Sequence, residues 1–127
     1  MEKIIDEKQD RLRRLELLKE NGILPYKDKF IKKDKIKDIP EMPIGTKVIT
    51  AGRLMLIREM GKLTFAHIQD YSGKMQIVLK DGTITTDKYK LLLKVIDIGD
   101  FIGVEGEVFK TQKGEISILV EKYEFLN

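Results

Sequence analysis

Residues 62–78 read KLTFAHIQDYSGKMQIV, two runs with the side-chain alternation of β-strands on either side of a Tyr-Ser-Gly turn. Because successive side chains of a strand point to opposite faces, Phe65 and His67 share one face of the first run. In the second run, an apolar row suited to a core consists of Met75, Ile77 and Leu79. Pairing the runs as a hairpin with this row inside places Phe65, His67, Lys74 and Gln76 together on the outer face. An exposed aromatic ring beside amide and cationic groups is typical of a surface that binds single-stranded nucleic acid.

Composition narrows the classes of protein. The chain has 127 residues, 42% hydrophobic and 35% charged, which predicts one globular domain with one core. The absence of cysteine excludes a disulfide framework and a thiolate metal site, and a single histidine argues against a zinc site. No apolar run reaches the length of a membrane span, and the N-terminal residues lack a secretory signal, so we expect a cytoplasmic protein without membrane contact. The net charge of +3 suits a polyanionic partner but is too small to establish one.

Three zones of the chain differ in their sequence pattern. Residues 1–21 carry the apolar stripe of an amphipathic helix that ends at Gly22. Residues 23–45 are lysine-rich and contain Pro25, Pro40 and Pro43, which predicts an irregular arm laid over the surface. From residue 46 onward the pattern is β. We therefore predict an N-terminal helix and arm over 1–45 and a barrel domain over 46–127.

The β zone contains segments for five strands and one helix. The first strand is expected over 46–58, with a bulge or bend at Gly52, and the hairpin supplies the second and third. A helix capped by Thr86 or Asp87 follows, and the face predicted to pack on the barrel consists of Tyr89, Leu92, Leu93 and Ile96. Alternating residues over 102–108 and 116–121 give the last two strands. This mainly β layout predicts a five-stranded Greek-key barrel of the OB-fold type, which binds oligonucleotides across strands two and three and the adjoining loops.

Short motifs along nearly the whole chain carry a family resemblance. They are RLRRL at 11–15, NGILPY at 21–26, AGRLM at 51–55, MGK at 60–62, FAHIQD at 65–70, DIGDFIGVEG at 97–106 and KTQKGE at 110–115. In this order and spacing they closely resemble the N-terminal anticodon-binding domain of class II lysyl-tRNA synthetase, while aspartyl- and asparaginyl-tRNA synthetases carry a related domain. The resemblance implies that the catalytic domain, with its sites for ATP and Mg²⁺, lies outside this chain, so no cofactor and no catalytic residue is expected here.

The resemblance also implies roles for individual residues. In the family, the phenylalanine that matches Phe65 stacks on the middle base of the lysine anticodon, a uridine. The residues that match Arg58 and Gln76 form hydrogen bonds with that base. These roles suit uracil, which presents two carbonyl acceptors and one N–H donor. Glu115 matches a glutamate, in the loop before the last strand, that contacts a neighbouring base. Without the resemblance, Phe65 could equally be a core residue in a strand of different register, and the three polar residues could be ordinary solvated positions.

Further RNA contacts are expected around this group. His67 and Lys74 flank the hairpin face, although His67 also suits a half-buried structural role. The expected phosphate contacts, which would supply affinity without sequence information, are Arg11, Arg13, Arg14, Lys110 and Lys113. The expected partners are the anticodon stem-loop of lysine tRNA, the catalytic domain of the same synthetase, and a second copy through the N-terminal helix and barrel.

Three functions from different classes remain open from the sequence. The leading one is recognition of the uridine-rich lysine anticodon. The second is a free-standing OB-fold protein that binds single strands with little sequence preference and needs Phe65 but not the combination of Arg58, Gln76 and Glu115. The third is a dimerisation or assembly domain, for which Phe65 would be dispensable. Catalysis by the chain itself is not expected, because no nucleophile and base, metal ligand set or phosphate-binding loop stands out.

Overall fold

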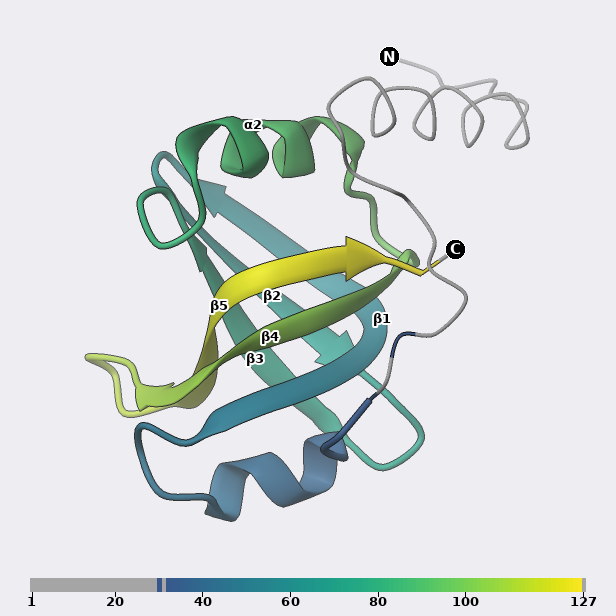
Figure 1. Ribbon diagram of the computed structural model, residues 1–127, viewed down its shortest axis with the longest axis vertical. Coiled ribbons are helices and arrows are strands. Elements are labelled where there is room, and N and C mark those ends of the chain that lie inside the picture. The colour runs from purple at the N-terminus through teal and green to yellow at the C-terminus, as the bar shows by residue number, and fades with distance from the viewer. Residues whose placement is uncertain (1–29, 31, 127) are drawn as a thin grey trace.

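Strands in the C-terminal part of the chain close into a barrel with helices at its two ends (Figure 1). The computed structural model describes residue 30 and residues 32–126, and in this part five strands follow the order β1-β2-β3-β5-β4 around the barrel. The elements are η1 (Ile36–Glu41), β1 (Lys47–Met60), β2 (Leu63–Gln69), β3 (Lys74–Lys80), α2 (Thr86–Val95), β4 (Phe101–Lys110) and β5 (Ile116–Phe125). The predicted mainly β barrel with a helix between its third and fourth strands is confirmed. The helix predicted over 1–21 lies outside the described residues.

The hairpin has the predicted faces. Antiparallel pairing of β2 and β3 places Phe65 opposite Val78 and His67 opposite Gln76. The inward side chains of the two strands are Thr64, Ala66, Ile68, Met75, Ile77 and Leu79, all of them buried. Val78, expected in a mostly polar row, is 3% exposed because its cross-strand neighbours Phe65 and Leu119 cover it. The outer face of the hairpin is therefore more apolar than the sequence predicts.

Strand β1 curves through two parts of the sheet (Figure 1). Its first half pairs with β4 and its second half with β2, as predicted for a long strand in a curled sheet. At Gly52 a Cβ atom would lie 2.9 Å from the carbonyl oxygen of Gln69, so this close approach of two strands requires glycine. The bulge lies further along, where the pairing with β2 shifts between Leu54 and Leu56. The extra residue is Met55.

Helix α2 covers one end of the barrel (Figure 1), and its buried residues are Tyr89, Leu91, Leu92 and Val95. The predicted face does pack on the barrel, since Tyr89 and Leu92 are buried and Leu93 and Ile96 are half-buried against the core. The prediction missed Leu91 and Val95, which are also buried. Apolar residues occupy more than one stripe of this helix, so its packed surface is wider than the single predicted stripe. The helix also begins one residue earlier than expected, since Thr85 is the N-cap residue and makes no side-chain capping bond.

The opposite end of the barrel is closed by η1, a 3₁₀ helix. Ile36 and Ile39 of this helix are fully buried in the core. The prediction of an irregular surface arm is therefore wrong for residues 36–41. A short 3₁₀ helix needs few backbone hydrogen bonds, so it tolerates Pro40, which has no N–H, and burial of two isoleucines stabilises it. The division of the chain at residue 46 stays a prediction.

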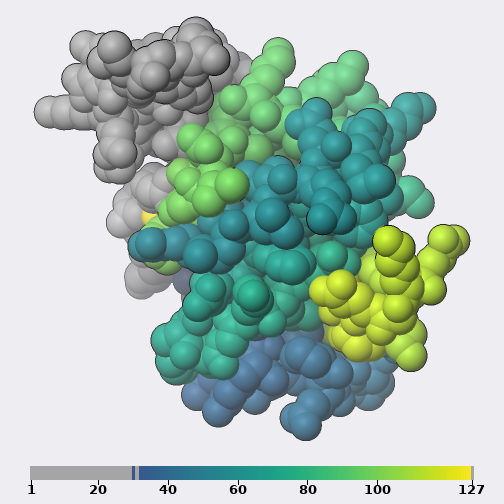
Figure 2. Space-filling model, turned by 180° about the vertical axis from the view of Figure 1, so that it is seen from behind, coloured from purple at the N-terminus to yellow at the C-terminus, as the bar shows by residue number. Residues whose placement is uncertain are grey.

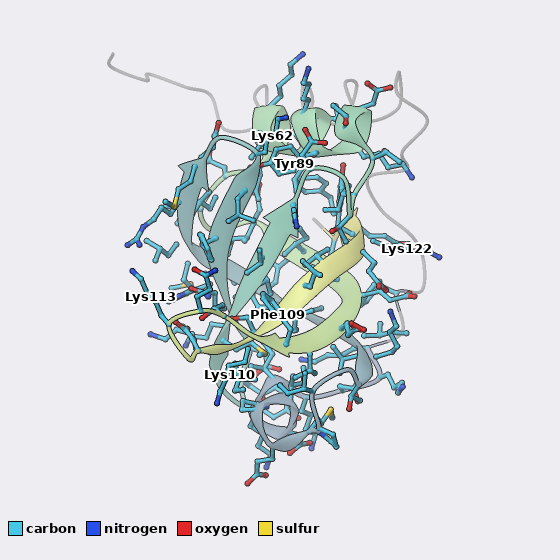
Figure 3. All side chains as sticks on the ribbon, turned by 90° about the vertical axis from the view of Figure 1, so that its left-hand side faces the viewer. Lys62, Tyr89, Phe109, Lys110, Lys113 and Lys122 are labelled. Atoms are coloured by element: carbon cyan, nitrogen blue, oxygen red, sulfur yellow. The ribbon has the colours of Figure 1, made fainter. Side chains whose placement is uncertain are left out.

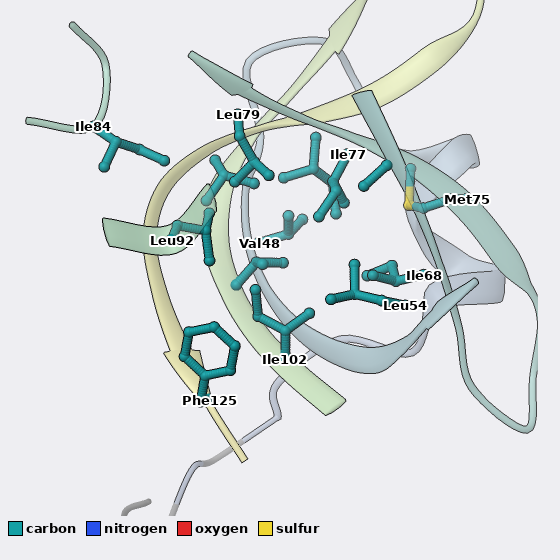
Figure 4. Close-up of a cluster of buried hydrophobic side chains, with 14 of the residues drawn as sticks. Val48, Leu54, Ile68, Met75, Ile77, Leu79, Ile84, Leu92, Ile102 and Phe125 are labelled. Atoms are coloured by element: carbon teal, nitrogen blue, oxygen red, sulfur yellow. The ribbon is translucent and has the colours of Figure 1, made fainter. Parts of the chain in front are cut away.

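The core fills the barrel between these two helices (Figure 4). Side chains from every strand meet there, and the members labelled in the figure are Val48, Leu54, Ile68, Met75, Ile77, Leu79, Ile84, Leu92, Ile102 and Phe125. One polar pair lies at its edge, where the Thr64 and Tyr89 hydroxyls are 2.8 Å apart and the Tyr89 hydroxyl donates to the carbonyl oxygen of Gly61 at 3.0 Å. This pair connects α2 to the start of the hairpin. The strands are thus fixed on their inner side, and the outer side is available for other contacts.

Asp70 connects the arm over residues 23–45 to the turn between β2 and β3 through hydrogen bonds and an ion pair. Its Oδ1 atom accepts hydrogen bonds from the Ser72 amide and hydroxyl, both at 2.6 Å, and from the Gly73 amide at 2.9 Å. Its Oδ2 atom accepts the Ile36 amide at 3.3 Å and forms an ion pair with Lys32. Partial burial would raise the pKa of Asp70, but the hydrogen bonds from Lys32 and Ser72 outweigh it and hold the pKa well below its usual range.

Replacing Asp70 with asparagine is expected to destabilise the fold at pH 6 by about 1.5–3 kcal/mol, the range for hydrogen bonds to a charged group. Because the folded-state pKa is lowered, the carboxylate stabilises the fold above its unfolded pKa of about 3.9 and loses this effect as the pH falls toward the folded value. Urea unfolding should therefore show a larger loss of stability from pH 6 to pH 3 in the parent than in the variant. Asp38→Asn, at an exposed position, is the control. Equal pH dependence of parent and Asp70→Asn would contradict this assignment.

Candidate nucleic-acid interface

The outer faces of β1, β2 and β3 form one continuous surface. Residues directly opposite in neighbouring strands share a face, so Arg58, Phe65 and Val78 form one row across the three strands. The adjacent row consists of Leu56, His67, Gln76 and Ser117, the last contributed by β5. The register thus excludes a core position for Phe65. Arg58, Phe65, His67 and Gln76, singled out in the sequence, lie on the same face.

The bulge at Met55 puts Arg58 on this face. Along the first half of β1 the inward residues alternate, and Val48, Thr50 and Leu54 are fully buried. Unbroken alternation would continue inward through residues 56 and 58. One extra residue reverses the alternation, so that Leu56 pairs with His67 and Arg58 with Phe65 on the outside. Strand patterning from the sequence missed this bulge; the signal available was that regular alternation would bury an arginine.

Phe65 is half-buried between Val78 and Arg58, its neighbours in the row. Flanking strands hold such a ring at its edges and leave one face for a ligand, which is the arrangement on which unpaired bases stack. Gln76 lies diagonally across the strand pair from Phe65, and such neighbours are about 7–8 Å apart at their backbones. A base stacked on the ring would therefore have its edge within reach of Gln76 and Arg58.

Gln76 is connected to the loop between β4 and β5. Its Nε2 atom donates to the Ser117 hydroxyl at 3.0 Å, and that hydroxyl donates to the carbonyl oxygen of Glu115 at 3.4 Å. The Glu115 amide in turn donates to the Thr111 hydroxyl at 3.1 Å, which orders the loop, and the Glu115 side chain is exposed. The predicted base contacts Gln76 and Glu115, far apart in the chain, are thus joined through one serine. Sequence patterning did not indicate this role for Ser117.

Exposed cations surround the face. Lys74 is exposed at the start of β3. Lys110 and Lys113 lie at the β4–β5 loop, as Figure 3 shows. Lys62, which the sequence analysis did not single out, is exposed at the turn between β1 and β2 near α2. In Figure 2 the yellow-green atoms of the β4–β5 loop stand beside the teal atoms of the hairpin. The positive charges suit a polyanionic strand that crosses the face from one loop to the other.

Other predicted contacts have different outcomes. Arg11, Arg13 and Arg14 lie outside the described residues. His67 is half-buried between Leu56 and Gln76, where it could serve either of its predicted roles. Among residues 30 and 32–126, no group of three acidic, histidine or cysteine side chains could hold a metal ion. The helices in this same part of the chain are all too short or too polar to cross a membrane.

Comparison with known proteins agrees with this fold. A tRNA anti-codon family model, described as an OB-fold nucleic acid binding domain, matches residues 48–126. The chain belongs to this family. Apart from Lys47, the first residue of β1, the matched region contains all five strands of the described structure and the outer face built from them. In OB-folds generally, oligonucleotides bind across strands two and three and the adjoining loops.

Several curated relatives that are similar in sequence to this chain are lysine–tRNA ligases. The ligase of Carboxydothermus hydrogenoformans is 47% identical over 119 residues, which are 91% of this chain and 24% of the relative. Those of Syntrophomonas wolfei and Magnetococcus marinus are 41% and 37% identical over 123 residues, covering 94% and 90% of this chain and 25% of each relative. The resemblance to lysyl-tRNA synthetase is confirmed. The chain spans about a quarter of the length of these relatives.

Proposed function

We propose that this chain binds the anticodon stem-loop of lysine tRNA on the outer face of β1, β2 and β3. The observation that carries the proposal is the row that joins Arg58 to Phe65, with Gln76 diagonally beside it. An aromatic ring with an arginine and an amide at its edge fits one unpaired base better than it fits a duplex or a protein surface. The lysine–tRNA ligases among its relatives give the choice of tRNA.

Stacking and hydrogen bonding have separate tasks in this proposal. Phe65 supplies affinity with little preference among bases, because every base has a π face. Arg58 donates to a carbonyl oxygen of uracil, and Gln76 accepts its N–H. Cytosine has no N–H at that position, so one buried polar group would be left without a partner. Glu115, a pure acceptor on the adjacent loop, would select an N–H or amino group of a neighbouring base.

The wider context forms part of the same proposal. The chain acts as the anticodon-binding part of a lysine–tRNA ligase, and a catalytic domain beyond this chain attaches lysine to the tRNA with ATP and Mg²⁺. The partners are that catalytic domain and a second copy in a homodimer through the N-terminal helix and barrel, in the cytoplasm. Lys74, Lys110 and Lys113, with Arg11, Arg13 and Arg14, contact phosphates and make the affinity depend on salt.

Changing the middle uridine of the stem-loop to cytidine is expected to weaken binding about fivefold to 150-fold, the equivalent of about 1–3 kcal/mol for one unpaired buried group. Fluorescence titration of both stem-loops at two salt concentrations measures this. Gln76→Ala should remove most of the difference, whereas Lys122→Ala, an exposed position away from the β4–β5 loop, should preserve it (Figure 3). Equal binding that fades with salt would indicate a generic single-strand binder, and no binding would favour an assembly domain.

A further inference from the structure

Ser117 is a buried hydroxyl at the seam between the hairpin and the β4–β5 loop. It is fully buried in β5, and parallel pairing with β3 sets it beside Gln76. Its hydroxyl contacts the Gln76 side chain at 3.0 Å and the carbonyl oxygen of Glu115 at 3.4 Å. A serine hydroxyl has one proton to donate and two lone pairs that accept. The hydroxyl can therefore donate to only one of these two partners and must accept from the other.

The direction of the bonds follows from this single proton. A backbone carbonyl oxygen can only accept, so the serine proton goes to Glu115. The hydroxyl can then only accept from Gln76, which must turn its Nε2 atom, not its Oε1 atom, toward the serine. The amide oxygen of Gln76 is left on the other side of the amide group. The half-buried glutamine thus presents an acceptor toward the outer face.

We propose that Ser117 is a positioning residue that fixes the Gln76 amide in the orientation which selects uridine. This inference rests on the proposed function. With the oxygen presented, Gln76 accepts the ring N–H of uracil. With the amide flipped, its NH₂ group would face the base and suit the ring nitrogen of cytosine, which is an acceptor. Without Ser117 nothing in this contact favours one orientation over the other, and the preference for uridine should fall.

Ser117→Ala is the test, with affinities for the uridine and cytidine stem-loops as the readout. We expect the uridine-to-cytidine affinity ratio to fall about threefold to tenfold, the effect of one ordinary hydrogen bond. Ser117→Cys, which keeps the side-chain volume but forms only weak hydrogen bonds, should lower the uridine-to-cytidine affinity ratio in the same way. Ser117→Thr, which keeps the hydroxyl, should have the same ratio as the parent. Thermal unfolding confirms that each variant is folded. If Ser117→Ala does not fold, Ser117→Cys supplies the same measurement.

A double-mutant cycle separates positioning from a general structural effect. In a Gln76→Ala background, Ser117→Ala should not lower the ratio further, because its effect passes through the glutamine. A ratio unchanged in folded Ser117→Ala and Ser117→Cys, in a parent that discriminates, would overturn the inference and leave the proposed function intact. A further fall in the Gln76→Ala background would also overturn it. A parent that binds both stem-loops equally would instead contradict the proposed function.

Discussion

Replacing Phe65 with alanine is expected to weaken binding of every single-stranded oligonucleotide by about fivefold to 150-fold, the equivalent of about 1–3 kcal/mol per stacked base. The ring lies on the outer face, between Val78 and Arg58, and the inward residues of β2 fill the core without it. Its removal should therefore cost binding more than folding. The ratio of uridine to cytidine affinity should change less than the affinities do, because Arg58 and Gln76 still read the edge of the base.

Two variants at the same position sharpen this result. Phe65→Tyr keeps a ring and should bind nearly as well as the parent, whereas Phe65→Leu keeps an apolar side chain without a ring and should bind like the alanine variant. Fluorescence titration gives the affinities, and urea unfolding shows whether each variant keeps its fold. Full binding by folded Phe65→Ala would mean that the ring is not the stacking platform, and the assembly function would then become the better explanation.

Replacing Ile36 and Ile39 together with alanine is expected to remove most of the stability of the domain. Both side chains are fully buried in the barrel end closed by η1. A buried isoleucine cut to alanine costs about 2–5 kcal/mol, and a whole domain has only about 5–15 kcal/mol. Urea unfolding at neutral pH should show a large fall in the midpoint, or a protein that is unfolded before denaturant is added.

Ile44 offers a matched control for this prediction, since it belongs to the same arm but is 58% exposed. Ile44→Ala should leave the midpoint almost unchanged. A double variant as stable as the parent would show that the barrel folds without the arm, as the predicted boundary at residue 46 implies. A large loss would place the boundary before η1 and make the arm part of the barrel domain.

The fold was predictable from the sequence where its signals are local. Alternation and turn residues located the hairpin, β4 and β5, because side-chain period and turn chemistry act within a few residues. The differences in η1, β1 and α2 depend on distant parts of the chain. Burial of η1 depends on an open barrel end, the bulge at Met55 on the register with β2, and the buried face of α2 on how the helix crosses the barrel.

The candidate site was predicted less evenly. Alternation alone brought Phe65, His67 and Gln76 to one face, and the structure places them there. Arg58 and Glu115 were predicted only from the family resemblance. Strand patterning does not reveal the bulge at Met55 or the hydrogen bonds that join Gln76 to Glu115 through Ser117. Ser117 could not be predicted at all, since its partner Gln76 is 41 residues away and the two meet through the pairing of β3 with β5.

The bulge at Met55 makes chain length, and not only residue type, a determinant of what β1 shows to the solvent. The inward and outward positions alternate in one order before the bulge and in the opposite order after it. Arg58 faces outward because the extra residue Met55 lies between Leu54 and Leu56. A shortening or lengthening by one residue here would exchange the two faces from Leu56 to Met60 while leaving every remaining side chain identical. In this strand, therefore, alignment gaps carry as much functional information as substitutions, and an arginine found at the matching column of a relative occupies the same place only if the extra residue is also kept.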